Sequence, residues 1–87
     1  MLHEFRGKRY RVVRKSLDEG THGLTTSPDT PEPTLLVDSK LRGRTRLETE
    51  IHEALHACFW DMSEEAVDET ANSLALFLWK IGYRLDA

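Results

Sequence analysis

The sequence contains a single cysteine, Cys58, among 87 residues. No internal disulfide can form, which excludes the small secreted proteins that disulfides hold together. No apolar run approaches the roughly 20 residues that a membrane-spanning helix needs. The N-terminal stretch MLHEFRGKRY also lacks the apolar segment of a signal peptide. These absences predict a cytoplasmic protein that has no membrane partner.

The chain also has little material for a hydrophobic core, since apolar residues make up 39% of it and charged residues 31%. A chain this short buries only about 60% of the surface that its unfolded form exposes. Its length allows one domain, residues 1–87. A metal ion that joined two elements of such a domain would contribute stability as well as chemistry.

Charge is divided unevenly along the chain, although the net charge is only −3. Residues 1–46 carry ten Lys and Arg against six Asp and Glu, whereas residues 47–87 carry two against nine. A basic half can indicate a nucleic-acid partner. The residues that would bind it are Arg6, Lys8, Arg9, Arg11, Arg14 and Lys15. Because the whole chain is acidic, we favour a solvated basic face and expect no nucleic acid.

The first half of the chain is typical of strands and loops. KRYRVVRK (8–15) is rich in β-branched and aromatic residues and predicts a strand. Residues 16–34 contain two glycines and three prolines and predict a loop, which at that length is either functional or mobile. TLLVDS (34–39) predicts a second strand and is the best candidate for a sheet edge beside the helices.

The second half predicts two helices. Thr45 and Glu48 have the spacing of a capping box, so the first helix is expected to begin near Arg46 and to span roughly 46–61. Apolar residues then recur with the helical period and are expected to form its buried face. These residues are Leu47, Ile51, Leu55, Cys58, Phe59 and Met62.

Ser63 is suited to cap a second helix over roughly 64–81, and Gly82 is suited to end it. The predicted fold class is therefore α+β. A small sheet of two or three strands and a long loop occupy residues 1–44, and an antiparallel helical hairpin occupies residues 45–87.

IHEALH (51–56) places two histidines four residues apart, with a glutamate directly after the first. On a helix His52 and His56 lie one turn apart at the rim of the apolar face, where both imidazoles can reach one metal ion. Glu53 lies further round and would act as a base toward water on that metal. The same pattern also occurs on helices that are merely polar. Two imidazoles and a carboxylate suit one zinc ion.

A third ligand must come from another element, because zinc sites take three or more protein ligands. The antiparallel second helix is the obvious source. Helical geometry leaves Asp68 and Glu64 as candidates, whereas Glu65 and Glu69 point outward. An acid in the first turn also suits the helix dipole, which accounts for Glu64 fully and for Asp68 less well. His22, in the long loop, could also approach the metal but is more simply a loop residue.

The chain resembles zincin metallopeptidases of the gluzincin kind. More closely, it resembles the compact HExxH proteins of bacteria and phages that are related to the ImmA/IrrE-type metallopeptidases. The resemblance rests on LETEIHEALHA (47–57), SEEAVDETANSLALFLW (63–79) and KIGYRL (80–85), about half of the chain. It implies a minimal zincin-like domain.

In gluzincins the third ligand stands in an E-x-x-A-[N/D] pattern on the next helix. Here that frame reads Asp68-Glu69-Thr70-Ala71-Asn72. The resemblance thus implies Asp68 as the ligand and Asn72 as a partner of His52. Because aspartate is one methylene shorter than the glutamate of the family, Glu64 stays the alternative.

The function that the resemblance implies is a zinc-dependent metallopeptidase, in which Glu53 is the general base and a peptide or protein is the substrate. An extended peptide could add to the sheet edge as a further strand. One alternative is a metal-stabilised interaction module with little or no turnover. Another is a small nucleic-acid-binding protein that uses the basic first half. The sequence leaves the substrate open, and also whether the protein is a monomer or a dimer.

Overall fold

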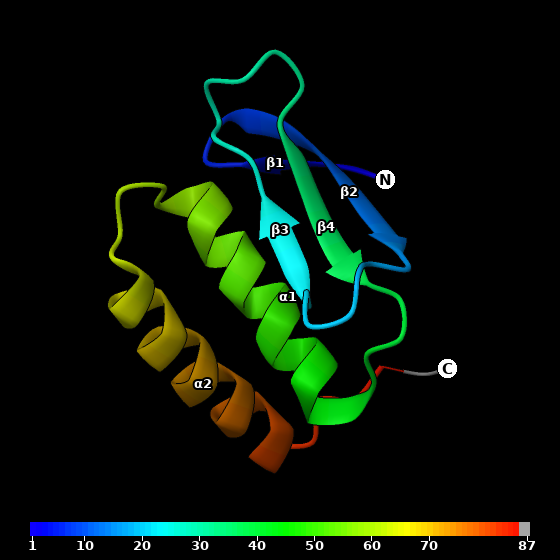
Figure 1. The fold of residues 1–87 in the computed structure, drawn as a ribbon. Coiled ribbons are helices and arrows are strands. Elements are labelled where there is room, and N and C mark those ends of the chain that lie inside the picture. Colours follow the sequence, from blue (N-terminus) through cyan, green and yellow to red (C-terminus); the bar gives the residue numbers. More distant parts are fainter. Residues whose placement is uncertain (86–87) are drawn as a thin grey trace.

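Four strands form one mixed sheet with the order β1-β2-β4-β3 in the computed structural model, which describes residues 1–85 (Figure 1). The strands are β1 (Leu2–Phe5), β2 (Lys8–Lys15), β3 (Gly23–Thr25) and β4 (Thr34–Asp38). β2 and β4 are parallel, whereas β1 and β3 run antiparallel to their neighbours. The predicted fold class, α+β with a small sheet before a helical hairpin, is confirmed, but the sheet has four strands instead of two or three.

The two additional strands are the edges of the sheet. β1 turns into β2 through Arg6 and Gly7, whose φ angles of 48° and 82° are those of a two-residue hairpin turn. β3 lies inside the segment 16–34 that the sequence predicts as loop, and three residues are too few to carry a strand pattern. The prediction that TLLVDS forms the edge beside the helices is therefore wrong, because β4 lies between β2 and β3.

The helices are α1 (Gly43–Cys58) and α2 (Glu64–Lys80). α1 begins before the predicted capping box: Arg42 occupies the N-cap position and no side chain caps the helix. The start of α2 is confirmed, because the Ser63 hydroxyl accepts a hydrogen bond from the backbone N–H of Ala66 at 3.1 Å. Gly82, with φ of 104°, ends α2 as predicted, and its N–H donates to the carbonyl of Trp79 at 3.1 Å.

Helix α1 lies between the sheet and α2, so it packs on two sides (Figure 1). Its buried residues are Thr49, Glu53 and Ala57. The predicted apolar face is only half-buried, since none of its residues from Leu47 to Met62 is fully buried and Phe59 is 43% exposed. Small and polar side chains face the strands instead, which lets α1 approach them closely.

The core on the sheet side consists of Tyr10, Leu35, Val37 and Ala57. Tyr10 is fully buried, and its hydroxyl donates to the carbonyl of Thr26 at 2.9 Å, which ties the long loop to the sheet. Burial, helped by the negative charge of Asp29, raises the pKa of the Tyr10 phenol. Within residues 1–85, neither helix has the length and apolar character to cross a membrane.

Candidate metal centre

The two histidines of IHEALH project from consecutive turns of α1 and meet at their ring nitrogens. Nε2 of His56 lies 3.2 Å from Nε2 of His52, and the ring centroids are 4.9 Å apart. Both side chains are largely but not fully buried, with exposed fractions of 20% for His52 and 16% for His56. The spacing of four residues thus brings two nitrogen lone pairs to one point at the edge of α1.

Glu64, the first residue of α2, brings a carboxylate to the same point. Its Oε1 lies 2.9 Å from Nε2 of His52, and its Oε2 lies 3.1 Å from Nε2 of His56. One ligand atom from each of the three residues lies within 4.8 Å of the others. Ser63 caps α2 immediately before Glu64 and so fixes the position from which this side chain reaches across.

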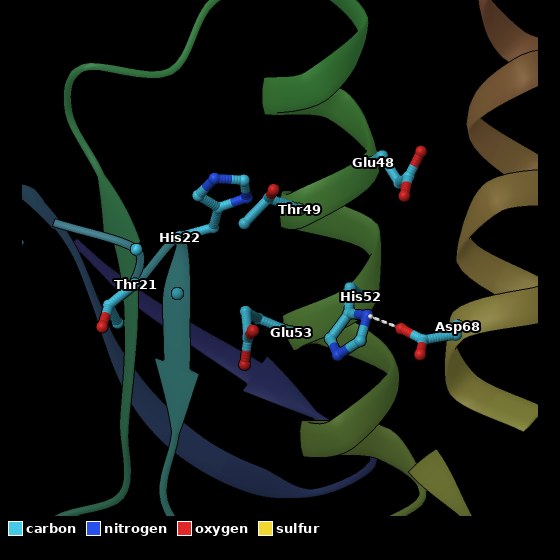
Figure 2. A pocket seen from close by; sticks show the side chains of 9 residues that line it. Thr21, His22, Glu48, Thr49, His52, Glu53 and Asp68 are labelled. Carbon is cyan, nitrogen blue, oxygen red and sulfur yellow. Dashed lines mark ion pairs between the residues drawn. The ribbon is translucent and has the colours of Figure 1, made fainter. Parts of the chain in front are cut away.

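Asp68 contacts the other nitrogen of the same imidazole. Its Oδ1 lies 3.2 Å from Nδ1 of His52, one helical turn further along α2 than Glu64 (Figure 2). Asn72, which the family pattern places beside His52, is exposed, and within residues 1–85 no hydrogen bond joins the two. Asp68 therefore makes the contact to His52 that the gluzincin pattern assigns to Asn72. Glu64 lies near both Nε2 atoms, in the position that the pattern assigns to Asp68.

With both histidines neutral, hydrogen bonds leave part of this arrangement unsatisfied. A neutral imidazole carries one N–H, so if Nδ1 of His52 donates to Asp68, its Nε2 is a lone pair. That lone pair would face a carboxylate oxygen of Glu64 at 2.9 Å, and Nε2 of His56 at 3.2 Å. If His52 is instead doubly protonated, it can donate to Asp68 and to Oε1 of Glu64, while His56 donates its Nε2–H to Oε2. A metal cation between the three groups would bind the same atoms with both histidines neutral.

The donor set also fits zinc in particular. Two nitrogens and a carboxylate are a common set for that ion, and zinc sites are nearly tetrahedral with Zn–N bonds of about 2.0–2.1 Å. Two ring nitrogens in such a site lie about 3.3 Å apart, close to the 3.2 Å between His52 and His56. An Nδ1–H bonded to a carboxylate, as at Asp68, is the usual way in which a ligating histidine is oriented.

The Glu53 side chain projects from α1 toward the sheet, whereas the His52 side chain points toward α2 (Figure 2). The Glu53 side chain is buried, at 7% exposure, and its Oε1 accepts a hydrogen bond of 2.6 Å from the hydroxyl of Thr25 on β3. Gly23 lies against it so closely that a Cβ at that position would sit 2.8 Å from Cγ of Glu53. The carboxylate is therefore held between the helix and the edge strand.

Two open cavities of about 380 and 340 Å³ lie along this edge, and both are lined by Gly23, His52 and Glu53. The first also includes Asp68 and His22. Within residues 1–85, no hydrogen bond joins the His22 side chain to His52 or His56. The second extends toward Glu64. The candidate ligands and the candidate base thus share one groove beside β3.

Thr25 and Gly23 are site residues that the sequence does not reveal. Both belong to the three-residue strand hidden in the expected loop, and neither stands in a pattern that points to His52 or Glu53. Their role follows only from the pairing of β3 with β4 at the edge next to α1.

Comparison of the chain with protein-family models, with curated proteins and with solved structures found no match in any of the three.

Proposed function

We propose that this chain is a zinc-dependent metallopeptidase whose single ion is held by His52, His56 and Glu64. The observation that carries the proposal is the meeting of two Nε2 atoms and one carboxylate at 2.9–3.2 Å, which brings three donors of the kinds that zinc prefers to one point. Zinc bound there would polarise the carbonyl of a peptide bond and lower the pKa of water.

Glu64 is the better third ligand of the two acids on α2. Both of its oxygens lie near the histidine Nε2 atoms, whereas Asp68 lies near Nδ1, on the far side of the His52 ring. Asp68 then fixes the tautomer of His52 by accepting its Nδ1–H. This division of roles uses both acids and leaves no ring nitrogen of His52 without a partner.

Glu53 serves as the general base in this proposal. It follows His52 directly in the chain and lines the same two cavities, so a water between the ligands and the edge strand lies within its reach. The Glu53 carboxylate would take the proton of the attacking water. The hydroxyl of Thr25, 2.6 Å from Oε1, holds that carboxylate in place. Glu53 would then return that proton to the amine that leaves when the peptide bond breaks.

The edge of β3 offers a place for an extended peptide. His22 and Thr26 form backbone hydrogen bonds to Asp38 and Thr34 on the β4 side. Bonded and non-bonded residues alternate in an antiparallel pair, so the backbone groups of Gly23 and Thr25 face the open edge. A substrate strand could pair with them and lie across Glu53. We therefore propose a peptide or protein segment in extended conformation as the substrate.

The test is to measure bound metal and peptide hydrolysis in the same preparations. Elemental analysis of the purified protein should find one zinc per chain, and a library of peptides should contain substrates. The Glu53→Gln variant should retain the zinc and lose hydrolysis by a factor of about 10²–10⁴, the contribution of a positioned base. Glu48→Gln is the matched control, since Glu48 lies on the same helix and lines the same cavity.

The outcomes separate the functions under consideration. Zinc bound at one per chain, with no hydrolysis of any peptide, would favour a metal-stabilised interaction module. Absence of zinc and of other divalent metals would contradict the metal centre itself.

The free thiol of Cys58 has no partner cysteine in the chain, so we propose the reducing cytoplasm as the location of the protein.

A further inference from the structure

A separate cavity of about 530 Å³ lies at the start of α1 and shares no lining residue with the two cavities beside His52. Four arginines from three parts of the chain line it. Arg14 comes from the end of β2, Arg42 and Arg46 come from the start of α1, and Arg84 follows α2. The fold therefore gathers these side chains, which no local sequence pattern groups together.

Most of the positive charges around this cavity have no counter-charge within residues 1–85. Among the residues that the structure describes, Glu50 is the one acid in the lining, and it pairs with Nε of Arg46 at 3.3 Å. Within residues 1–85, Arg14, Arg42 and Arg84 form no ion pair with a carboxylate. Like charges that converge without a counter-charge repel one another. In a chain with a net charge of −3, such a concentration of unpaired cations indicates an anionic ligand.

The guanidinium groups are nevertheless held in position by backbone carbonyls. Nη1 of Arg42 donates to the carbonyls of Ser39 and Leu41 at 2.6 and 2.8 Å. Nη1 of Arg84 donates to the carbonyl of Trp79 at 2.8 Å, and its guanidinium stacks on the Trp79 ring with 3.4 Å to the centroid. Within residues 1–85 these bonds occupy Nη1 alone, which leaves Nη2 and Nε of both arginines as donors toward a ligand.

We propose that this cavity binds a phosphate group, either as free phosphate or as part of a small organic phosphate. Arginine forks match the oxygens of phosphate in bidentate geometry, and three unpaired guanidiniums suit a ligand with more than one negative charge. Gly43, the first residue of α1, lines the same cavity, so the uncapped N–H groups of the first turn add to the donors.

A small phosphate fits better than a nucleic acid. The arginines surround a cavity, whereas a duplex needs a row of cations along an extended surface. Four basic residues of β2 are absent from the cavity lining, namely Lys8, Arg9, Arg11 and Lys15. The acidic second half of the chain would also repel a long polyanion. This inference does not depend on the proposed peptidase activity, because no residue is shared.

The experiment is a titration of the full ¹⁵N-labelled chain with inorganic phosphate, pyrophosphate and a nucleoside monophosphate, at constant ionic strength set with chloride. Backbone amide shifts should change around Gly43 and Arg84 and not around His52. The Arg42→Gln and Arg84→Gln variants should each weaken binding about tenfold or more, since hydrogen bonds to charged groups are worth at least that factor. The three ligands distinguish free phosphate from an organic phosphate.

Arg44→Gln is the matched control, because Arg44 lies between Arg42 and Arg46 in the chain but does not line the cavity. It removes the same charge and should leave the affinity within about twofold. Equal weakening by Arg44→Gln would show that only long-range charge matters and would overturn the proposal. Absence of amide shifts at millimolar ligand would also overturn it. So would a DNA oligonucleotide that binds more tightly than any small phosphate, with a steep salt dependence.

Discussion

The hydroxyl of Thr25 lies 2.6 Å from Oε1 of Glu53 and joins the edge strand β3 to helix α1 at the candidate metal centre. Both residues are buried, with exposed fractions of 8% and 7%. The same hydroxyl lies 3.1 Å from the main-chain carbonyl oxygen of Glu53, but its single proton serves one acceptor at a time. The hydroxyl is thus the one side-chain hydrogen-bond donor to the proposed base within residues 1–85.

Replacing Thr25 with Val should destabilise the fold by about 1–3 kcal/mol, because the substitution keeps the shape and leaves a buried carboxylate without its donor. Thr25→Ser keeps the hydroxyl and should lose less stability than Thr25→Val. Chemical denaturation of the two variants and the parent measures the difference. If Thr25→Val and Thr25→Ser unfold at the same denaturant concentration, the hydrogen bond contributes nothing and Glu53 is held by packing alone.

The two acids on α2 should respond differently when their charge is removed. Glu64→Gln should abolish tight zinc binding, since it removes a ligand from a three-residue set. Asp68→Asn should weaken zinc binding about 10–100-fold, the usual cost of losing a group that orients a ligating histidine. Competition with a chromophoric chelator measures both affinities. The opposite ranking would return the ligand role to Asp68, where the family pattern places it.

The sequence predicts those parts of the fold that have a local cause. β2 is recognisable from its β-branched residues, and α2 from the Ser63 cap and from Gly82. The convergence of His52 and His56 follows from helical spacing alone. Each of these features depends on residues within a few positions of one another in the chain.

The remaining features depend on contacts between distant segments. β3 is a strand only because it pairs with β4, and its register brings Thr25 to Glu53, 28 positions away. The residues that α1 buries differ from the predicted apolar face for a related reason. Ala57, which is small, and Glu53, which is hydrogen-bonded, are buried where α1 packs on the sheet. The larger apolar side chains lie elsewhere on the helix. Periodicity locates an apolar face but does not say which neighbour covers it.

The helix starts offer a paired test of local stabilisation. Ser63→Ala should destabilise the protein by about 1 kcal/mol, because it removes the hydroxyl that accepts the N–H of Ala66. Thr45→Ala should change stability by less than about 0.5 kcal/mol, since Thr45 is exposed inside α1 and caps nothing. Thermal unfolding followed by circular dichroism compares the two. A larger loss at Thr45 would restore the capping box that the sequence suggests.

Asp38 should make the stability of the fold depend on acid pH. Burial raises its pKa, but hydrogen bonds from the side chain and backbone of Lys40 and from the backbone of Leu17 outweigh that effect, and the pKa lies below its ordinary value. A carboxyl whose pKa is lowered by folding stabilises the protein fully above its unfolded pKa of about 4. That stabilisation is lost as the pH falls through the lower pKa of the folded state.

The Asp38→Asn variant should therefore be less stable than the parent at pH 7, and the difference should shrink as the pH is lowered below about 4. Urea denaturation at a series of pH values between about 2.5 and 7, the range that includes the titration of carboxyls, measures the difference. Asp61→Asn is the control, since Asp61 is exposed in the turn between the helices and should show no such convergence. A difference for Asp38→Asn that stays constant with pH would mean that the shape of the side chain matters and its charge does not.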